Sequence, residues 1–116
     1  MKSAKKEASK PVSATLVLLV ASLIVPVLIA QTNPSENIFK SKCATCHGPD
    51  GAGKTTMGTM LKIRDLRSED VQKQPDADLN RIIAKGKNKM PAFDGKLKKE
   101  QIEQLVTYVR ELGKKH

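Results

Sequence analysis

The sequence is poor in aromatic residues and in cysteine, and each shortage narrows what the chain can be. It has no tryptophan, one tyrosine and two phenylalanines in 116 residues. A small domain with so few large side chains has a marginal core of its own, which a buried apolar group would complete. With only two cysteines, a zinc site built from two cysteine pairs is excluded.

Both cysteines belong to one short motif, Cys43-Ala44-Thr45-Cys46-His47. The pattern C-x-x-C-H is typical of the attachment of c-type haem. Two thiols at this spacing can each add to a vinyl group on one edge of a porphyrin, and the histidine can bind the iron from the same side. A thiol–disulfide motif would lie beside a βαβ pattern, which is not found nearby. We therefore predict that Cys43, Cys46 and His47 hold one covalent haem c.

The first thirty residues have the layout of a targeting segment. The first ten carry four lysines, and an uncharged apolar stretch from Ala14 to Ala30 follows. This stretch is long for the core of a signal peptide and slightly short for a membrane helix. We predict that residues 1–30 are a signal peptide or an N-terminal membrane anchor, with membrane attachment through 11–35 in the second case. Both outcomes place the rest in the periplasm or on the extracytoplasmic face of the inner membrane.

The remainder, residues 31–116, is predicted to be one all-α domain. Asn33-Pro34-Ser35-Glu36 combines an N-cap, a proline at the first helical position and an acidic residue, as helix starts do. Apolar residues at helical spacing predict two further helices, with Gly86 and Gly113 as stops. The predicted helices cover 34–42, 76–85 and 98–112, with a shorter turn at 68–73. Residues 48–59 are predicted to be a loop, and no segment alternates as a β-strand does.

The second axial ligand of the iron has several candidates, namely Met57, Met60, Met90, His116 and lysines. Met90 precedes Pro91, which biases it toward an extended conformation and suits a side chain projecting from a stiff loop. Reach along the chain does not exclude Met57 and Met60, but we expect them to pack against the haem. His116 is the last residue, where chains fray. Met90 is the predicted second ligand.

Three segments together resemble the class I c-type cytochromes, and most of all a short bacterial, cytochrome c6-like monohaem protein. They are Cys-Ala-Thr-Cys-His-Gly at 43–48, Lys-Gly-Lys at 85–87 followed by Met-Pro-Ala-Phe at 90–93, and the helix ending in Tyr-Val-Arg at 108–110. The resemblance covers about 36–112. It implies the cytochrome c fold, with three to four short helices and long loops around one haem, here preceded by an N-terminal apolar helix.

The resemblance also implies specific contacts. It places Phe39 against Leu105 and Tyr108 where the first and last helices cross. It implies thioether bonds at Cys43 and Cys46, with His47 and Met90 as axial ligands. One departure concerns the loop after the motif: many relatives have a proline there, near the carbonyl that orients the histidine, but residues 51–66 contain no proline, so the sequence leaves open which carbonyl orients His47.

A nucleotide-binding pattern is also present in residues 48–55, which read G-P-D-G-A-G-K-T. A phosphate-binding loop needs a strand before it and a helix after it, and neither is predicted, so we expect no nucleotide.

The formal net charge of +9 suits acidic partners of any class. Nucleic acid is not expected, because aromatic residues do not alternate with the basic ones.

These observations predict an electron carrier rather than an enzyme. Acidic redox proteins such as an oxidase, a dehydrogenase or a reaction centre are the expected partners, and Lys85, Lys87 and Lys89 are expected to guide their docking. Two alternatives stay open. One is a membrane-tethered cytochrome subunit of a respiratory complex, and the other is a haem sensor or small enzyme in which Met90 is displaceable.

Overall fold

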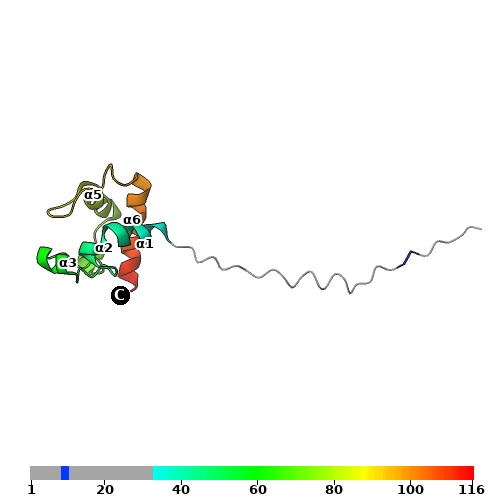
Figure 1. Cartoon of the computed structure of the whole chain (residues 1–116), viewed down its shortest axis with the longest axis horizontal. Helices are drawn as coiled ribbons and strands as arrows, with labels where there is room; N and C mark the ends of the chain where they lie inside the picture. The colour runs from blue at the N-terminus through cyan, green and yellow to red at the C-terminus, as the bar shows by residue number, and fades with distance from the viewer. Residues whose placement is uncertain (1–8, 11–32) are drawn as a thin grey trace, which may run out of the picture. The chain divides into compact units, whose positions relative to one another are not determined.

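The computed structural model describes residues 9–10 and 33–116, and its helices all lie in the second range. They are α1 (Pro34–Lys42), α2 (Ala44–His47), α3 (Thr56–Leu61), α4 (Glu69–Gln72), α5 (Asp76–Lys85) and α6 (Lys99–Lys114), as Figure 1 shows. Within these residues there is no β-strand, only two isolated bridges. The predicted all-α class is confirmed. The apolar segment expected before the domain lies outside the described residues.

Helix α1 begins where its sequence signals predicted. The side chain of Asn33 accepts a hydrogen bond from the Ser35 amide at 3.2 Å and another from the Ser35 hydroxyl at 2.6 Å. Pro34 occupies the first turn, where its missing N–H has no cost. An ion pair of 2.7 Å joins Glu36 to Lys40 one turn later. Local chemistry alone therefore accounts for the start of this helix.

Helices α1 and α6 cross (Figure 1) and bury the largest side chains of the domain between them. The rings of Phe39 and Tyr108 lie 5.1 Å apart at their centroids, tilted by 51°. Leu105, which is 2% exposed, belongs to the same cluster. The contact of Phe39 with this face of α6, implied by the resemblance, is present.

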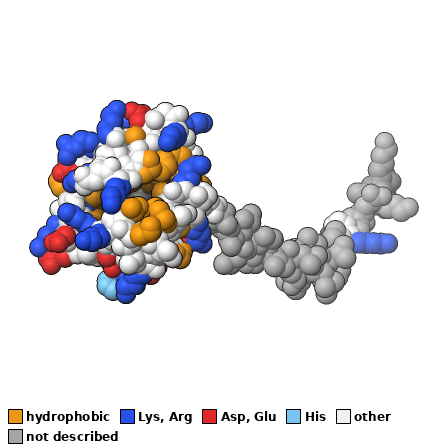
Figure 2. Space-filling model, turned by 60° about the vertical axis from the view of Figure 1, so that its left-hand side comes forward, with side chains coloured by type: hydrophobic (Ala, Val, Ile, Leu, Met, Phe, Trp, Pro, Cys, Tyr) orange, Lys and Arg blue, Asp and Glu red, His pale blue; other side chains and the backbone are white. Residues whose placement is uncertain are grey.

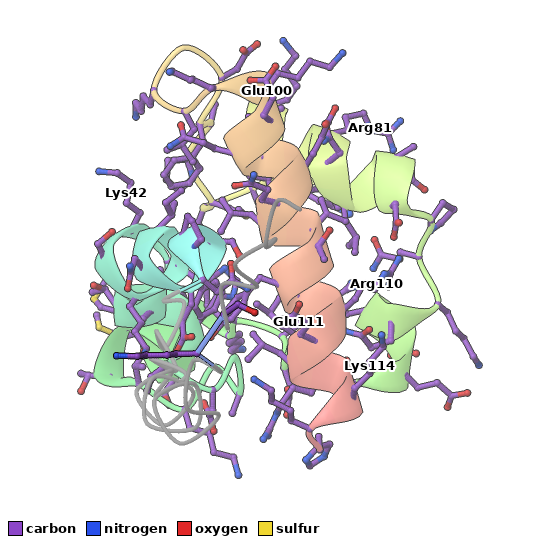
Figure 3. All side chains as sticks on the ribbon, turned by 90° about the vertical axis from the view of Figure 1, so that its right-hand side faces the viewer. Lys42, Arg81, Glu100, Arg110, Glu111 and Lys114 are labelled. Carbon is purple, nitrogen blue, oxygen red and sulfur yellow. The ribbon has the colours of Figure 1, made fainter. Side chains whose placement is uncertain are left out.

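The opposite side of α6 is tied to α4 and α5. Figure 3 shows Arg110 reaching from α6 toward the chain between those helices. Its guanidinium donates to the Gln72 carbonyl at 2.7 Å and to the Asp76 carboxylate at 2.7 and 2.9 Å. The side-chain amide of Gln72 in turn donates to the Leu66 and Val109 carbonyls. These bonds connect the segment 66–76, which contains α4, to α6.

Two features differ from the prediction. The predicted loop at 48–59 overlaps the first four residues of α3, because the Thr55 hydroxyl accepts a hydrogen bond from the Gly58 amide at 2.8 Å and caps a helix there. Helix α6 does not stop at Gly113 but continues to Lys114. A β-carbon at Gly113 would lie 2.4 Å from the side chain of Gln72, so this glycine permits close packing instead of ending the helix.

No helix in the described ranges combines the length and the apolar character needed to cross a bilayer.

Candidate cofactor site

The interior holds a cavity with an almost entirely apolar inner part and a wider part that also has polar and charged lining residues. Its enclosed part measures about 70 Å³ and is lined by residues from distant parts of the chain, namely Phe39, Cys43, His47, Leu66, Leu79, Ile82, Ile83, Met90, Leu105 and Val109. A wider part of about 460 Å³ shares His47, Leu66, Leu79, Ile82 and Met90 with it. The volume of the wider part is within the roughly 300–1,000 Å³ of small-molecule and cofactor sites.

The C-x-x-C-H motif forms the short helix α2 at one side of this cavity. The His47 amide donates to the Cys43 carbonyl at 2.9 Å, and the Cys43 amide donates to the Phe39 carbonyl at 2.8 Å, so α2 follows α1 almost without a break. Cys43 and His47 line the cavity, whereas Cys46 is half-buried beside it. The two cysteines are not joined to each other in a disulfide.

Burial determines the ionisation of the motif. It raises the pKa of the Cys43 thiol to about 11, with a smaller contribution from the neighbouring Cys46. It lowers the pKa of His47, because the apolar walls disfavour the charged ring. A neutral imidazole keeps a lone pair free for a metal ion.

The Nδ1 nitrogen of the same ring lacks a hydrogen-bond partner in the part of the chain that the structure describes. Nδ1 of His47 is buried and has no hydrogen-bond partner among the described residues. The sequence left open which carbonyl orients the ring, and no carbonyl of the described residues accepts a hydrogen bond from this atom.

Met90 approaches the cavity from a tight turn. The Met90 amide donates to the Lys87 carbonyl at 3.0 Å, and the Lys87 amide donates back to the Met90 carbonyl at 3.2 Å. Asn88 inside this turn has a left-handed φ of 54°, and Gly86 before it has a φ of 74°. A β-carbon on Gly86 would lie 2.5 Å from the Met90 carbonyl oxygen. The turn therefore places Met90 half-buried at the cavity while its neighbours stay in solvent.

The other two methionines and His116 do not line the cavity, although three of the candidate lysines, Lys62, Lys87 and Lys89, line its wide part. Met57 is 38% exposed and Met60 is 66% exposed, and neither lines either part of it. The expectation that both pack against a cofactor is therefore not met. His116 is exposed at the end of the chain.

Cations surround the wide part of the cavity. Lys62, Arg64, Lys87 and Lys89 line it, and no acidic residue of the described chain does. Figure 2 shows hydrophobic side chains gathered on one face with Lys and Arg around them. Two of the lysines predicted to guide docking, Lys87 and Lys89, are in this cationic rim.

The third predicted docking lysine, Lys85, does not line the cavity, and its ammonium pairs with the Asp94 carboxylate at 2.7 Å. Lys62 and Arg64 replace it, and the sequence reasoning missed them. Both follow α3, and recognising that helix from its threonine cap would have placed them beside the motif.

These residues fit a haem. Apolar walls suit a porphyrin, thiols on one side suit thioether attachment, and an imidazole and a thioether side chain at the same cavity are a known axial pair for haem iron.

Comparisons with known proteins agree with this fit. Residues 30–109 match the family model described as cytochrome c oxidase, cbb3-type, subunit III. Cytochrome c6 of Nostoc sp. is 39% identical over 92 residues, covering 77% of this chain and 76% of that protein. Cytochrome c6 of Synechococcus sp. is 31% identical over 102 residues, covering 88% of each. The solved structure of the KustC0563 c-type cytochrome is similar, with a TM-score of 0.63 and 31% identity, covering 67% of this chain and 95% of that one.

Proposed function

The chain belongs to the class I c-type cytochromes and is cytochrome c6-like, and from that premise we propose that Cys43 and Cys46 form its thioether bonds and that His47 and Met90 bind its iron. It is a monohaem electron-transfer protein with one covalently bound haem c. The observation that carries the proposal is that His47 and Met90, far apart in sequence, line both parts of one cavity.

The chain's own residues set how this site works. When bound, the haem supplies one-electron redox chemistry through its iron. The thioether of Met90 favours the reduced metal and raises the potential relative to ligation by two nitrogen atoms. The apolar walls exclude water from the site and disfavour the more highly charged oxidised state. If His47 and Met90 both bind the iron, no position on the metal would be open for a substrate, which supports a carrier and not an enzyme.

The cationic rim of Lys62, Arg64, Lys87 and Lys89 supports acidic redox proteins as partners. Four cations around one opening, with no acidic residue among its lining residues in the described chain, create a positive field that speeds encounter with negatively charged surfaces. An oxidase, a dehydrogenase or a reaction centre has the required redox chemistry. The basic leader supports a site of action outside the cytoplasmic membrane, in the periplasm or on its extracytoplasmic face.

The ligand assignment is tested by replacing Met90 with alanine, using Met60→Ala as the matched control because Met60 is 66% exposed and lies outside the cavity lining. Met90→Ala should remove the weak far-red absorption of the Met–Fe(III) bond and lower the midpoint potential. Met60→Ala should change neither. An unaltered spectrum and potential in Met90→Ala would contradict the assignment.

A second candidate function, a haem sensor or small enzyme, is favoured by the exposure of the residues around Met90. Fast binding of carbon monoxide to the reduced protein or of cyanide to the oxidised one would support it, whereas sluggish binding supports the carrier. The match to a family described as an oxidase subunit favours a third, a membrane-tethered subunit of a respiratory complex. Co-purification with a large complex in detergent would distinguish it from a free shuttle.

A further inference from the structure

The loop between α2 and α3 bonds to the last two carbonyls of the C-x-x-C-H motif. Carbonyls at the end of a helix have no partner inside the helix. The Gly53 amide donates to the His47 carbonyl at 2.7 Å, and the Thr55 hydroxyl donates to the Cys46 carbonyl at 3.0 Å. The backbone of both proposed haem-binding residues is therefore held by the glycine-rich run that matches the nucleotide pattern.

The Thr55 hydroxyl is used in both directions. It donates to the Cys46 carbonyl at 3.0 Å while it accepts the Gly58 amide at 2.8 Å as the N-cap of α3. A hydroxyl has one proton to donate and lone pairs to accept, so a single side chain joins the end of α2 to the start of α3. No hydrophobic side chain can make this pair of bonds.

Helix α3 lies directly on the backbone that Thr55 holds. A β-carbon at Gly58 would be 2.5 Å from the Cys46 carbonyl oxygen and 2.1 Å from the Gly53 carbonyl oxygen. These contacts leave no space for a side chain. A displaced Thr55 would therefore disturb Cys46 and α3 together.

The imidazole of His47 depends on this backbone support, because its buried Nδ1 has no partner among the described residues. A ligand histidine is usually oriented by a hydrogen bond from its second nitrogen. Here the bonds to the motif from Gly53 and Thr55 hold its main chain, through the His47 and Cys46 carbonyls.

We propose that Thr55 is a positioning residue for the haem-attachment motif, fixing the main chain at Cys46 through its carbonyl and limiting the movement of the adjoining His47. Thr55 does not line the cavity, so it acts through the motif and not on the haem. The inference rests on the proposed roles of Cys46 and His47.

The test compares Thr55→Val, which keeps the shape and removes the hydroxyl, with Thr55→Ser, which keeps the hydroxyl. The matched control is Thr107→Val, because the Thr107 hydroxyl bonds only to the Glu103 carbonyl within α6, at an exposed position. Each haem-loaded protein is examined for alkylatable thiols by mass spectrometry and for unreacted vinyl groups by its pyridine haemochrome band. Midpoint potential and amide hydrogen exchange are measured on the same samples.

In Thr55→Val we expect the Gly58 amide to exchange about tenfold faster, because it loses its acceptor. We also expect a fraction with a free Cys46 thiol and a haemochrome band at longer wavelength, with a changed midpoint potential. Thr55→Ser should restore the wild-type values, and Thr107→Val should match wild type throughout.

The outcomes separate this inference from the ligand assignment. Wild-type attachment, potential and exchange in Thr55→Val would overturn the positioning role alone. Equal damage in Thr55→Val and Thr55→Ser would also overturn it, since the hydroxyl would not be the cause, and this holds even if Thr55→Val folds poorly. A free Cys46 thiol in the wild-type holoprotein would instead contradict the proposed thioether.

Discussion

The two sides of the cavity differ in burial and in the number of hydrogen bonds that hold the proposed haem-binding residues. On the motif side, residues 43–58, the glycines that follow the motif are buried and the chain bonds repeatedly to itself. On the ligand-loop side, residues 85–93, most residues are exposed and Met90 is held by one turn with two hydrogen bonds. The firm side carries the proposed covalent bonds, and the open side carries the proposed replaceable one.

This difference has a physical consequence for an electron carrier. A tightly packed attachment side keeps one face of the haem fixed, so little rearrangement accompanies a change of oxidation state. An exposed ligand loop instead has few buried contacts, which places it among the parts of a protein that open first. Changes on the motif side should therefore act on folding and attachment, and changes on the loop side should act on the exchange of the sixth ligand.

The largest effect is expected from Gly58→Ala. The new β-carbon would meet the Gly53 and Cys46 carbonyl oxygens at 2.1 and 2.5 Å, and backbone on both sides leaves nothing flexible to yield. Although alanine is the better helix former, overpacking should lower the free energy of unfolding by about 3 kcal/mol. Urea unfolding of the holoprotein measures this, with exposed Thr59→Ala as the control, expected within about 0.5 kcal/mol of wild type. Equal stabilities would mean that the motif side is not tightly packed.

A smaller effect is expected in the Lys87–Met90 turn, where Asn88 has a φ of 54°. Alanine in this left-handed region costs roughly 1 kcal/mol, whereas glycine is free to adopt it. Asn88→Ala should therefore populate the open loop about fivefold more than Asn88→Gly. The binding rate of cyanide to the oxidised protein reports this opening. The same rate in both variants would show that the turn does not control the release of Met90.

The two sides also differed in how well the sequence predicted them. Helix α1 and the motif were predictable because their signals are local: an N-cap, a proline and the spacing of two cysteines and a histidine. Helix α3 was not, because its threonines and glycine are poor helix formers, and it is stabilised by a cap whose hydroxyl also bonds to Cys46. This pair of hydrogen bonds made by one hydroxyl can be recognised only in the folded chain.

Contacts between distant parts of the chain explain two further features that the sequence did not show. Gly113 has the position of a helix stop, yet the side chain of Gln72 occupies the space of its missing β-carbon and the helix continues. Lys85 has the same local surroundings as Lys87 in the sequence, but the fold brings Asp94 within 2.7 Å of Lys85 alone. No periodicity or composition encodes these contacts, so the membership of the cationic rim had to come from the structure.

The rim offers a third prediction, which concerns charge on the loop side. Lys87→Gln should slow reduction of hexacyanoferrate(III), a negatively charged oxidant, by about two- to threefold at low ionic strength, because it removes a charge at the opening. The double variant Lys85→Gln, Asp94→Asn removes an ion pair without changing net charge, and its rate should stay close to wild type. Doubling the ionic strength should reduce the difference. Rates that do not depend on salt would rule out steering by the rim.

The smallest effect concerns the ion pairs of Arg67, which link Asp50 on the motif side to Asp65 in the segment after α3. The Arg67 guanidinium bonds to the Asp65 carboxylate at 2.8 and 2.9 Å and lies 3.7 Å from that of Asp50. It lowers the pKa of Asp65 to about 2. Since the ordinary value is near 3.9, the folded state binds this proton less readily, so the stabilisation is present above about pH 4 and is lost as the pH falls toward 2.

Because the Asp65–Arg67 pair is partly solvated, its contribution to the free energy of unfolding should stay below about 1 kcal/mol. Titration of the Asp65 carboxyl by NMR in the reduced protein should show the low pKa. Arg67→Gln should return it toward the ordinary value, whereas Arg81→Gln, which breaks the pair with Asp78 on α5, should leave it alone. An ordinary pKa for Asp65 in the wild-type protein would mean that this ion pair is absent in solution. The firmness of the motif side would then rest on its glycine packing and on Thr55.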